Sequence, residues 1–211
     1  MPSSVDVDVD ADKAALRRRV LAARAAMPIP EREAAGRLIR DHVLEMPEVA
    51  TAGTIAVYYS VGTEPDTRRL VYALWKRGSY VILPLLRPDG DLDWASFEGP
   101  ESMEPGPRGL MQPAEPPRGI SVVARADAVL VPALAVDRGG NRLGRGGGSY
   151  DRALARVGAQ VPVMALIYDT ELVVSLPVAS HDRPVRAVVR PGHGITRLPA
   201  WLSLAVTSGE C

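Results

Sequence analysis

Two apolar segments with a helical segment between them constrain the fold of this chain more than any other feature. Residues 54–60 read TIAVYYS and residues 80–86 read YVILPLL, and such apolar runs are typical of buried strands. Between them, residues 67–77 show a helical pattern that ends at Gly78. A strand, a helix and a second strand in this order favour a parallel sheet with a right-handed crossover.

The rest of the chain extends this alternation of helices and strands. Helices are expected over 13–27, 30–44 and 150–157, strands over 128–136, 162–168 and 185–189, an edge strand over 91–97, and an irregular loop over 99–117. No structure is assigned to 191–211. We expect a disordered tail over residues 1–11 and then, over 12–211, one three-layer α/β/α domain with a mainly parallel, Rossmann-like sheet.

Two of the expected helices have recognisable apolar faces. Leu16, Val20 and Ala23 share one face of the first helix, which Asp12 is placed to cap. Leu38 and Val43, with neighbouring alanines, supply the apolar face of the second.

Charge and cysteine content exclude several classes of protein. The chain has 25 basic and 25 acidic side chains, so its formal net charge is zero and nothing favours a broad nucleic-acid-binding face. Its one cysteine, Cys211, permits neither an internal disulfide nor a zinc site built on several cysteines. No apolar run reaches the ~20 residues of a membrane span, and the acidic start does not resemble a signal peptide. We expect a cytoplasmic protein with small-molecule partners, either a monomer or a weak homo-oligomer.

The segment 139–152, GGNRLGRGGGSYDR, carries the clearest functional signal. It follows an expected strand and precedes an expected helix. Glycines allow backbone N–H groups to approach an anion closely, and Arg142 and Arg145 add positive charge beside them. Lys13 and Arg17 lie one turn apart near the start of the first helix, where a bound phosphate would relieve their mutual repulsion. The pattern predicts a nucleotide-phosphate site, with Asp151 available for a metal ion.

Plainer and rival interpretations of the glycine run stay open at this point. The run is also compatible with an ordinary loop. The P-loop pattern fails because it requires Gly-Lys-Ser/Thr where this chain has Gly-Ser-Tyr. The dinucleotide fingerprint is matched by Gly144 and Gly146, but Ser149 stands at its third glycine and the run does not follow its strand directly. A dinucleotide-binding oxidoreductase therefore remains a weaker alternative.

Several segments together resemble the 5-formyltetrahydrofolate cyclo-ligase family, also called 5,10-methenyltetrahydrofolate synthetases. They occur in the expected order over most of the chain. The segments are 13–17 (KAALR), 59–60 (YS) with 64–67 (EPDT), 83–84 (LP), 112–113 (QP), and Asp137 with 140–152. The last is specific, since few other families combine Arg-Leu-Gly with a glycine cluster and Tyr-Asp.

The resemblance implies a NagB/cyclo-ligase-like fold and an ATP-driven ring closure that uses Mg²⁺. In this family ATP phosphorylates the formyl oxygen of 5-formyltetrahydrofolate, N10 attacks the activated carbon, and phosphate leaves. The implied ATP contacts are Lys13, Arg17, Arg142, Leu143, Gly144, Arg145, Gly146, Gly147, Gly148, Ser149 and Tyr150. The implied folate contacts are Val61, Asp66, Gln112, Arg145 and Ser149.

The resemblance also assigns a catalytic and a metal-binding role. Arg145 would stabilise the transferring phosphoryl group through its guanidinium. Asp151 and Asp182 would hold Mg²⁺, since hard carboxylate oxygens suit that ion. Each acid also has a plainer interpretation: Asp66 as part of a helix start, Asp151 as a first-turn residue, and Asp182 as an ordinary loop carboxylate.

Two positions depart from the family pattern. Gly147 stands where some members carry a lysine, and Ser149 stands where the family usually has the first of two tyrosines. A non-catalytic relative that binds folate or a nucleotide is therefore a second alternative. The basic residues and Asp151 argue against it, because a pure folate binder needs no ATP–Mg²⁺ site.

Overall fold

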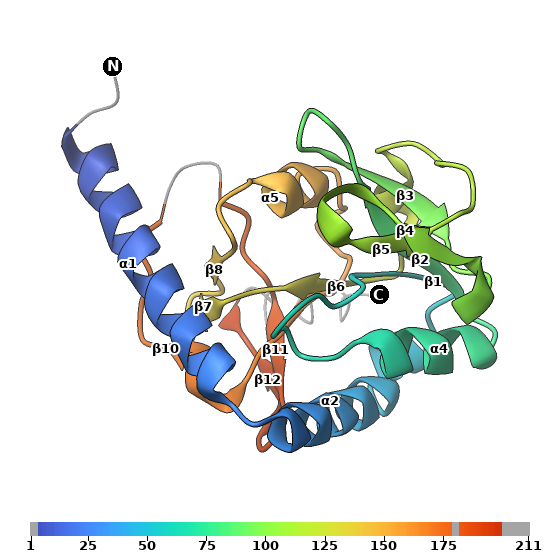
Figure 1. Cartoon of the computed structure of the whole chain (residues 1–211), viewed down its shortest axis with the longest axis horizontal. Coiled ribbons are helices and arrows are strands. Elements are labelled where there is room, and N and C mark those ends of the chain that lie inside the picture. The colour runs from blue at the N-terminus through green and yellow to red at the C-terminus, as the bar shows by residue number, and fades with distance from the viewer. Residues whose placement is uncertain (1–3, 179–181, 200–211) are drawn as a thin grey trace, which may run out of the picture.

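A seven-stranded sheet forms the centre of the molecule (Figure 1). The computed structural model describes residues 4–178 and 182–199. The strand order is β12-β11-β9-β6-β1-β2-β3. Strands β11, β9, β6, β1 and β2 run parallel, and β3 and β12 are antiparallel edges. The strands are β1 (Thr54–Val57), β2 (Tyr80–Leu86), β3 (Leu92–Ser96), β6 (Ala128–Pro132), β9 (Val163–Leu166), β11 (Ala187–Arg190) and β12 (Gly194–Arg197).

Helices cover both faces of this sheet, so the predicted three-layer α/β fold is confirmed. Helices α2 (Ile29–Leu44), α3 (Pro47–Ala50) and α4 (Arg68–Lys76) enclose one apolar cluster against the sheet. Helix α5 (Ser149–Leu154) and the 3-10 turn η3 (Val122–Arg125) enclose a second cluster on the other face. Figure 1 shows α2 and α4 on the side of the sheet opposite α5.

The buried face of α2 contains the predicted Val43 and Ala35 but not the predicted Leu38. Ala35, Ile39 and Val43 are buried at a spacing of four residues, whereas Leu38 is 45% exposed. Leu38 lies one position before Ile39, about 100° around the helix, and so falls outside the face that packs on the sheet.

Helix α1 (Ser4–Ala26) flanks a small sheet at one side of the molecule (Figure 1). That sheet has the order β10-β7-β8, built from β7 (Ala135–Asp137), β8 (Arg142–Leu143) and β10 (Leu172–Val173). Leu16 and Val20 pack against its apolar cluster as predicted, but Ala23 is exposed and Arg24 occupies the buried position.

The start of α1 also corrects the sequence prediction. The helix begins at Ser4, so helical structure extends into the segment expected to be a disordered tail, and Asp12 is no N-cap.

Three further differences concern short elements. The predicted irregular loop contains a hairpin, β4 (Met103–Pro105) with β5 (Met111–Pro113), and the turns η1 (Pro100–Ser102) and η2 (Pro107–Gly109). The predicted strand 128–136 is two strands, β6 and β7, which belong to different sheets. Strand β12 lies in the segment to which no structure was assigned, and Cys211 falls outside the described residues.

Nothing in the described chain has the character of a membrane span: none of its helices is both long enough and apolar enough.

Candidate active site

A cavity of about 910 Å³ opens beyond the carboxyl ends of the central strands. Strand β1 is followed by Tyr58 and Tyr59, and β6 ends at Pro132, followed by Ala133; all four residues line the cavity. Sequence order moves from β1 to β2 on one side, and the chain later returns to place β6 on the other side of β1. Such switch points are where open α/β sheets bind ligands.

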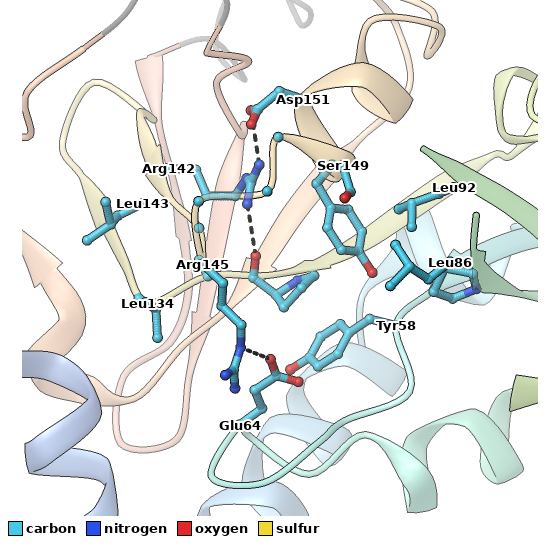
Figure 2. Close-up of a pocket in the computed structure, with 18 of the residues that line it drawn as sticks. Tyr58, Glu64, Leu86, Leu92, Leu134, Arg142, Leu143, Arg145, Ser149 and Asp151 are labelled. Atoms are coloured by element: carbon cyan, nitrogen blue, oxygen red, sulfur yellow. Dashed lines mark hydrogen bonds and ion pairs between the residues drawn. The ribbon is translucent and has the colours of Figure 1, made fainter. Parts of the chain in front are cut away.

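The lining of the cavity is strongly basic on one side. Among the described residues, seven basic and three acidic side chains line it, although the whole chain has zero formal net charge. The basic residues are Lys13, Arg17, Arg24, Arg142, Arg145, Arg152 and Arg183. The opposite wall is apolar and aromatic, with Tyr58, Leu86 and Leu92 facing the arginines (Figure 2). One cavity therefore offers charge for phosphate or carboxylate groups and a surface for a ring system.

The glycine run forms the basic wall. Gly146 and Gly148 have positive φ angles of 102° and 65°, a backbone region that other residues rarely adopt. Residues 142–148 line the cavity continuously, and Ser149 begins α5 directly afterwards. Because α5 has only six residues, the shape of the loop matters more here than the dipole of the helix.

Among the residues that the structure describes, three ion pairs join basic and acidic side chains of the cavity. Lys13 Nζ lies 2.6 Å from Asp182 Oδ2, and Arg142 Nη2 lies 3.0 Å from Asp151 Oδ1. The third pair joins Arg145 Nε and Glu64 Oε1 at 3.1 Å (Figure 2). In each pair a cation expected to bind phosphate is held by a carboxylate.

Asp151 and Asp182 lie on adjoining segments. The backbone N–H of Arg183, the residue after Asp182, donates to Asp151 Oδ1 at 3.3 Å. The structure thus brings together the two acids that the resemblance assigned to one metal ion.

Most of the predicted contacts lie at the cavity, and two do not. Every predicted ATP contact lines it, as does Val61. Asp66 lies outside: its carboxylate accepts hydrogen bonds from the Arg68 side chain, the Arg68 backbone and Ser60 at the start of α4. Burial raises the pKa of Asp66, but these hydrogen bonds outweigh it and leave the pKa lowered. This matches the plainer interpretation of Asp66 as part of a helix start.

Gln112 also lies outside the cavity. Its side chain contacts Glu104 across the β4–β5 hairpin and packs over Gly106. Leu110 and Met111, on the same hairpin, line the cavity instead.

Sequence reasoning missed several residues of the cavity, Glu64 above all. The Glu64 side chain is only 8% exposed and accepts a hydrogen bond from the Val61 N–H at 3.0 Å. Tyr58 donates its hydroxyl proton to the Pro65 carbonyl at 3.0 Å and so holds the loop that carries Glu64. Glu64 belongs to a segment that carried the family resemblance, but its partner Arg145 is 81 residues away and no local pattern links them.

Two tyrosines of the cavity remain protonated. Burial raises the pKa of Tyr58 well above its ordinary value, and the negative charge of Glu64 raises it further. The same two causes raise the pKa of Tyr150. Both phenols are therefore neutral hydrogen-bonding groups at physiological pH.

Comparison with known proteins identifies the class of this fold and site. The family model of the 5-formyltetrahydrofolate cyclo-ligase family matches residues 9–191. The 5-formyltetrahydrofolate cyclo-ligase of Mycolicibacterium smegmatis is 35% identical over 191 residues, which cover 88% of this chain and 97% of that protein. The Escherichia coli K12 enzyme of the same name is 32% identical over 171 residues, covering 80% and 94%.

A solved structure agrees with these sequence relatives. The structure of Aquifex aeolicus 5,10-methenyltetrahydrofolate synthetase superposes with a TM-score of 0.77 and 27% identity, covering 89% of this chain and 93% of that one. This chain belongs to the 5-formyltetrahydrofolate cyclo-ligase family. The resemblance found in the sequence is confirmed, and with it the identification of the chain as a cyclo-ligase family enzyme.

The position of the glycine run argues against the dinucleotide-binding alternative. A dinucleotide fingerprint joins a strand of the central sheet directly to a helix. Here β7 and β8 of the small sheet intervene between β6 and α5.

Proposed function

We propose that this enzyme converts 5-formyltetrahydrofolate to 5,10-methenyltetrahydrofolate, with conversion of ATP to ADP and phosphate. Its family membership supports the overall conversion. The observation that carries the proposal for two substrates is the division of one cavity into a basic wall and an aromatic wall. The basic wall suits a triphosphate, and the aromatic wall suits the pterin ring.

The chemistry requires activation of a poor leaving group. The formyl oxygen attacks the γ-phosphorus of ATP, and the bond from that phosphorus to the bridging oxygen of ADP breaks. N10 then attacks the formyl carbon and loses its proton, while the carbon–oxygen bond breaks and phosphate leaves. The protein contributes position and charge rather than a covalent nucleophile.

The residues of the basic wall divide these tasks. Lys13 and Arg17 from α1 and the loop 142–150 hold the phosphates, and Arg145 stabilises the charge on the transferring group. The Arg145 side chain lines the cavity and is 51% exposed, so it can move from Glu64 to a phosphate. Val61 and Ser149, which also line the cavity, contact the folate.

Asp151 and Asp182 fit a magnesium ion. Both are hard oxygen donors, and the hydrogen bond from Arg183 to Asp151 holds their segments together. No group of three or more potential metal ligands occurs among the residues that the structure describes, so phosphate oxygens and water would complete the shell. The ion would neutralise phosphate charge; Lys13 and Arg142, which now pair with the two acids, would turn to the phosphates.

The test is a turnover assay. The purified enzyme is mixed with ATP, Mg²⁺ and 5-formyltetrahydrofolate, and the near-ultraviolet absorbance of the methenyl product is followed alongside phosphate release. We expect one phosphate per product, and no product when ATP or Mg²⁺ is omitted. Folate binding without product would instead support the non-catalytic alternative, and calorimetric binding of NAD would support the dinucleotide-binding one.

A further inference from the structure

Arg152, in α5, joins two segments that are far apart in sequence. Its Nη2 atom donates to the Gly90 carbonyl at 2.6 Å and to the Gly147 carbonyl at 3.0 Å. One nitrogen thus uses both of its hydrogens on two different backbone segments. Its Nη1 atom also lies 3.0 Å from the position that a Cβ on Gly148 would occupy, so the guanidinium packs closely under the loop.

The two segments belong to different walls of the cavity, which meet at Arg152. Gly147 belongs to the glycine loop, on the basic wall. Gly90 lies in the turn between β2 and β3, whose flanking residues Leu86 and Leu92 form part of the apolar wall. A single side chain therefore links one wall to the other.

The hydrogen bond to Gly147 also sets the direction of a peptide group. In a trans peptide the carbonyl and the following N–H point to opposite sides. Holding the Gly147 carbonyl therefore turns the Gly148 N–H away from Arg152. The other end of the loop has the same arrangement, because Arg17 Nε donates to the Gly144 carbonyl at 2.9 Å. A loop rich in glycine has little conformational preference of its own, so such external contacts decide its shape.

We propose that Arg152 is a positioning residue, which holds the glycine loop in its binding shape and at a fixed distance from the β2–β3 turn. It acts through the Gly147 and Gly90 carbonyls. Without Arg152 the loop samples other shapes. The apparent nucleotide affinity then falls in proportion to the fraction of molecules that keep the competent shape. The part of this proposal that concerns ATP rests on the proposed function; the part that concerns the free loop does not.

The experiment compares Arg152→Gln with Arg156→Gln. Arg156 lies four residues further along, just beyond the end of α5, and its guanidinium binds the same hairpin through Asp91, at 3.0 and 2.5 Å, instead of a carbonyl of the glycine loop. Both substitutions remove one positive charge that bonds to the segment between β2 and β3. Two measurements on the ligand-free proteins report the order of the loop. One is ¹⁵N relaxation of the Gly146, Gly147 and Gly148 amides, and the other is the rate of tryptic cleavage after Arg145.

We expect cleavage after Arg145 to accelerate about tenfold in Arg152→Gln, a factor that corresponds to the loss of one charge-assisted hydrogen bond. In Arg156→Gln the cleavage rate should stay within about twofold of the wild-type rate. The apparent affinity for a non-hydrolysable ATP analogue should fall by a similar factor, with kcat at saturating ATP within about threefold of the wild-type value. Arg152→Lys, which keeps a charged donor on a shorter stem, should lie between Arg152→Gln and wild type in both measurements.

Unchanged loop order in ligand-free Arg152→Gln would overturn the proposal, even if ATP affinity fell, because Arg152 would then act by direct contact with phosphate. A wild-type protein without turnover, but with the expected loop effect, would overturn the proposed function and leave the role of Arg152 intact.

Discussion

At the scale of single residues, Arg145 is the side chain on which the proposed chemistry depends most. Its guanidinium lies on the exposed part of the loop and pairs with Glu64 through one hydrogen bond. If it stabilises charge that develops on the transferring phosphoryl group, Arg145→Ala should lower kcat by about 10²-fold or more. Steady-state kinetics give kcat and the KM for ATP. Arg138→Ala, an exposed arginine that does not line the cavity, is the matched control. A change in KM alone would assign Arg145 to binding only.

Glu64 competes with phosphate for Arg145 in the ligand-free enzyme. Glu64→Gln keeps the size of the side chain and removes its charge, so binding of a non-hydrolysable ATP analogue in the absence of folate should tighten by up to about fivefold. The effect is modest because Arg145 is half exposed and solvent screens the pair. Calorimetric titration measures it. Asp66→Asn, which neutralises a carboxylate on the same loop but outside the cavity, should leave the affinity unchanged; weaker binding to Glu64→Gln would contradict the competition.

At the scale of elements, a charge pair between Asp91 and Arg156 holds the turn between β2 and β3 to the segment that follows α5. The hydrogen bonds from Arg156 lower the pKa of Asp91 against the opposing effect of burial, and the Leu92 N–H lowers it further. Because the folded-state pKa lies below the unfolded value, the pair contributes to the free energy of unfolding above the unfolded pKa of about 3.9 and loses that contribution as pH falls through the folded pKa.

Asp91→Asn should therefore be less stable than wild type at pH 7, and the difference should shrink as the pH falls below about 4. Urea unfolding of both proteins between pH 3 and pH 7 measures this. Glu98→Gln, at an exposed carboxylate, should track the wild type at every pH. A difference that stays constant down to pH 3 would mean that Asp91 acts through its shape and not through its charge.

The elements also show what sequence reasoning can and cannot reach. The extent of β2 follows from a continuous apolar run, and the edge strand β3 follows from alternating apolar and polar residues. Helix α2 follows from helical spacing of apolar residues together with its prolines. The two- and three-residue strands β7, β8 and β10 are too short to produce a period. The glycine loop was found because its residues are consecutive. Glu64 and Arg24 were missed because their partners lie 81 and 147 residues away, and only the folded chain brings such pairs together.

At the scale of the whole molecule, the cavity depends on how α1 is attached to the rest of the chain. Helix α1 supplies Lys13, Arg17 and Arg24 to the cavity, but its apolar residues that contact the domain are only partly buried. Arg24 is 1% exposed and is the strongest link: it binds both carboxylate oxygens of Glu171, at 2.7 and 2.8 Å, and donates to the Ala133 carbonyl at 2.6 Å.

Removal of Arg24 alone should therefore lower the free energy of unfolding far more than removal of both Arg24 and Glu171. Arg24→Ala leaves a buried carboxylate without its cation, a defect worth about 3–5 kcal/mol, whereas Arg24→Met with Glu171→Leu fills the same space with apolar groups and should lie near the wild-type stability. Urea unfolding gives these differences.

Hydrogen exchange should show faster opening of residues 13–26 in Arg24→Ala while the central strands keep their protection, since those strands belong to separate apolar clusters. Because Lys13 and Arg17 move with the helix, nucleotide affinity should fall in Arg24→Ala. A single variant that loses less than about 1 kcal/mol, or one in which strands and α1 open together, would contradict the view that Arg24 fastens an otherwise loosely packed helix to the domain.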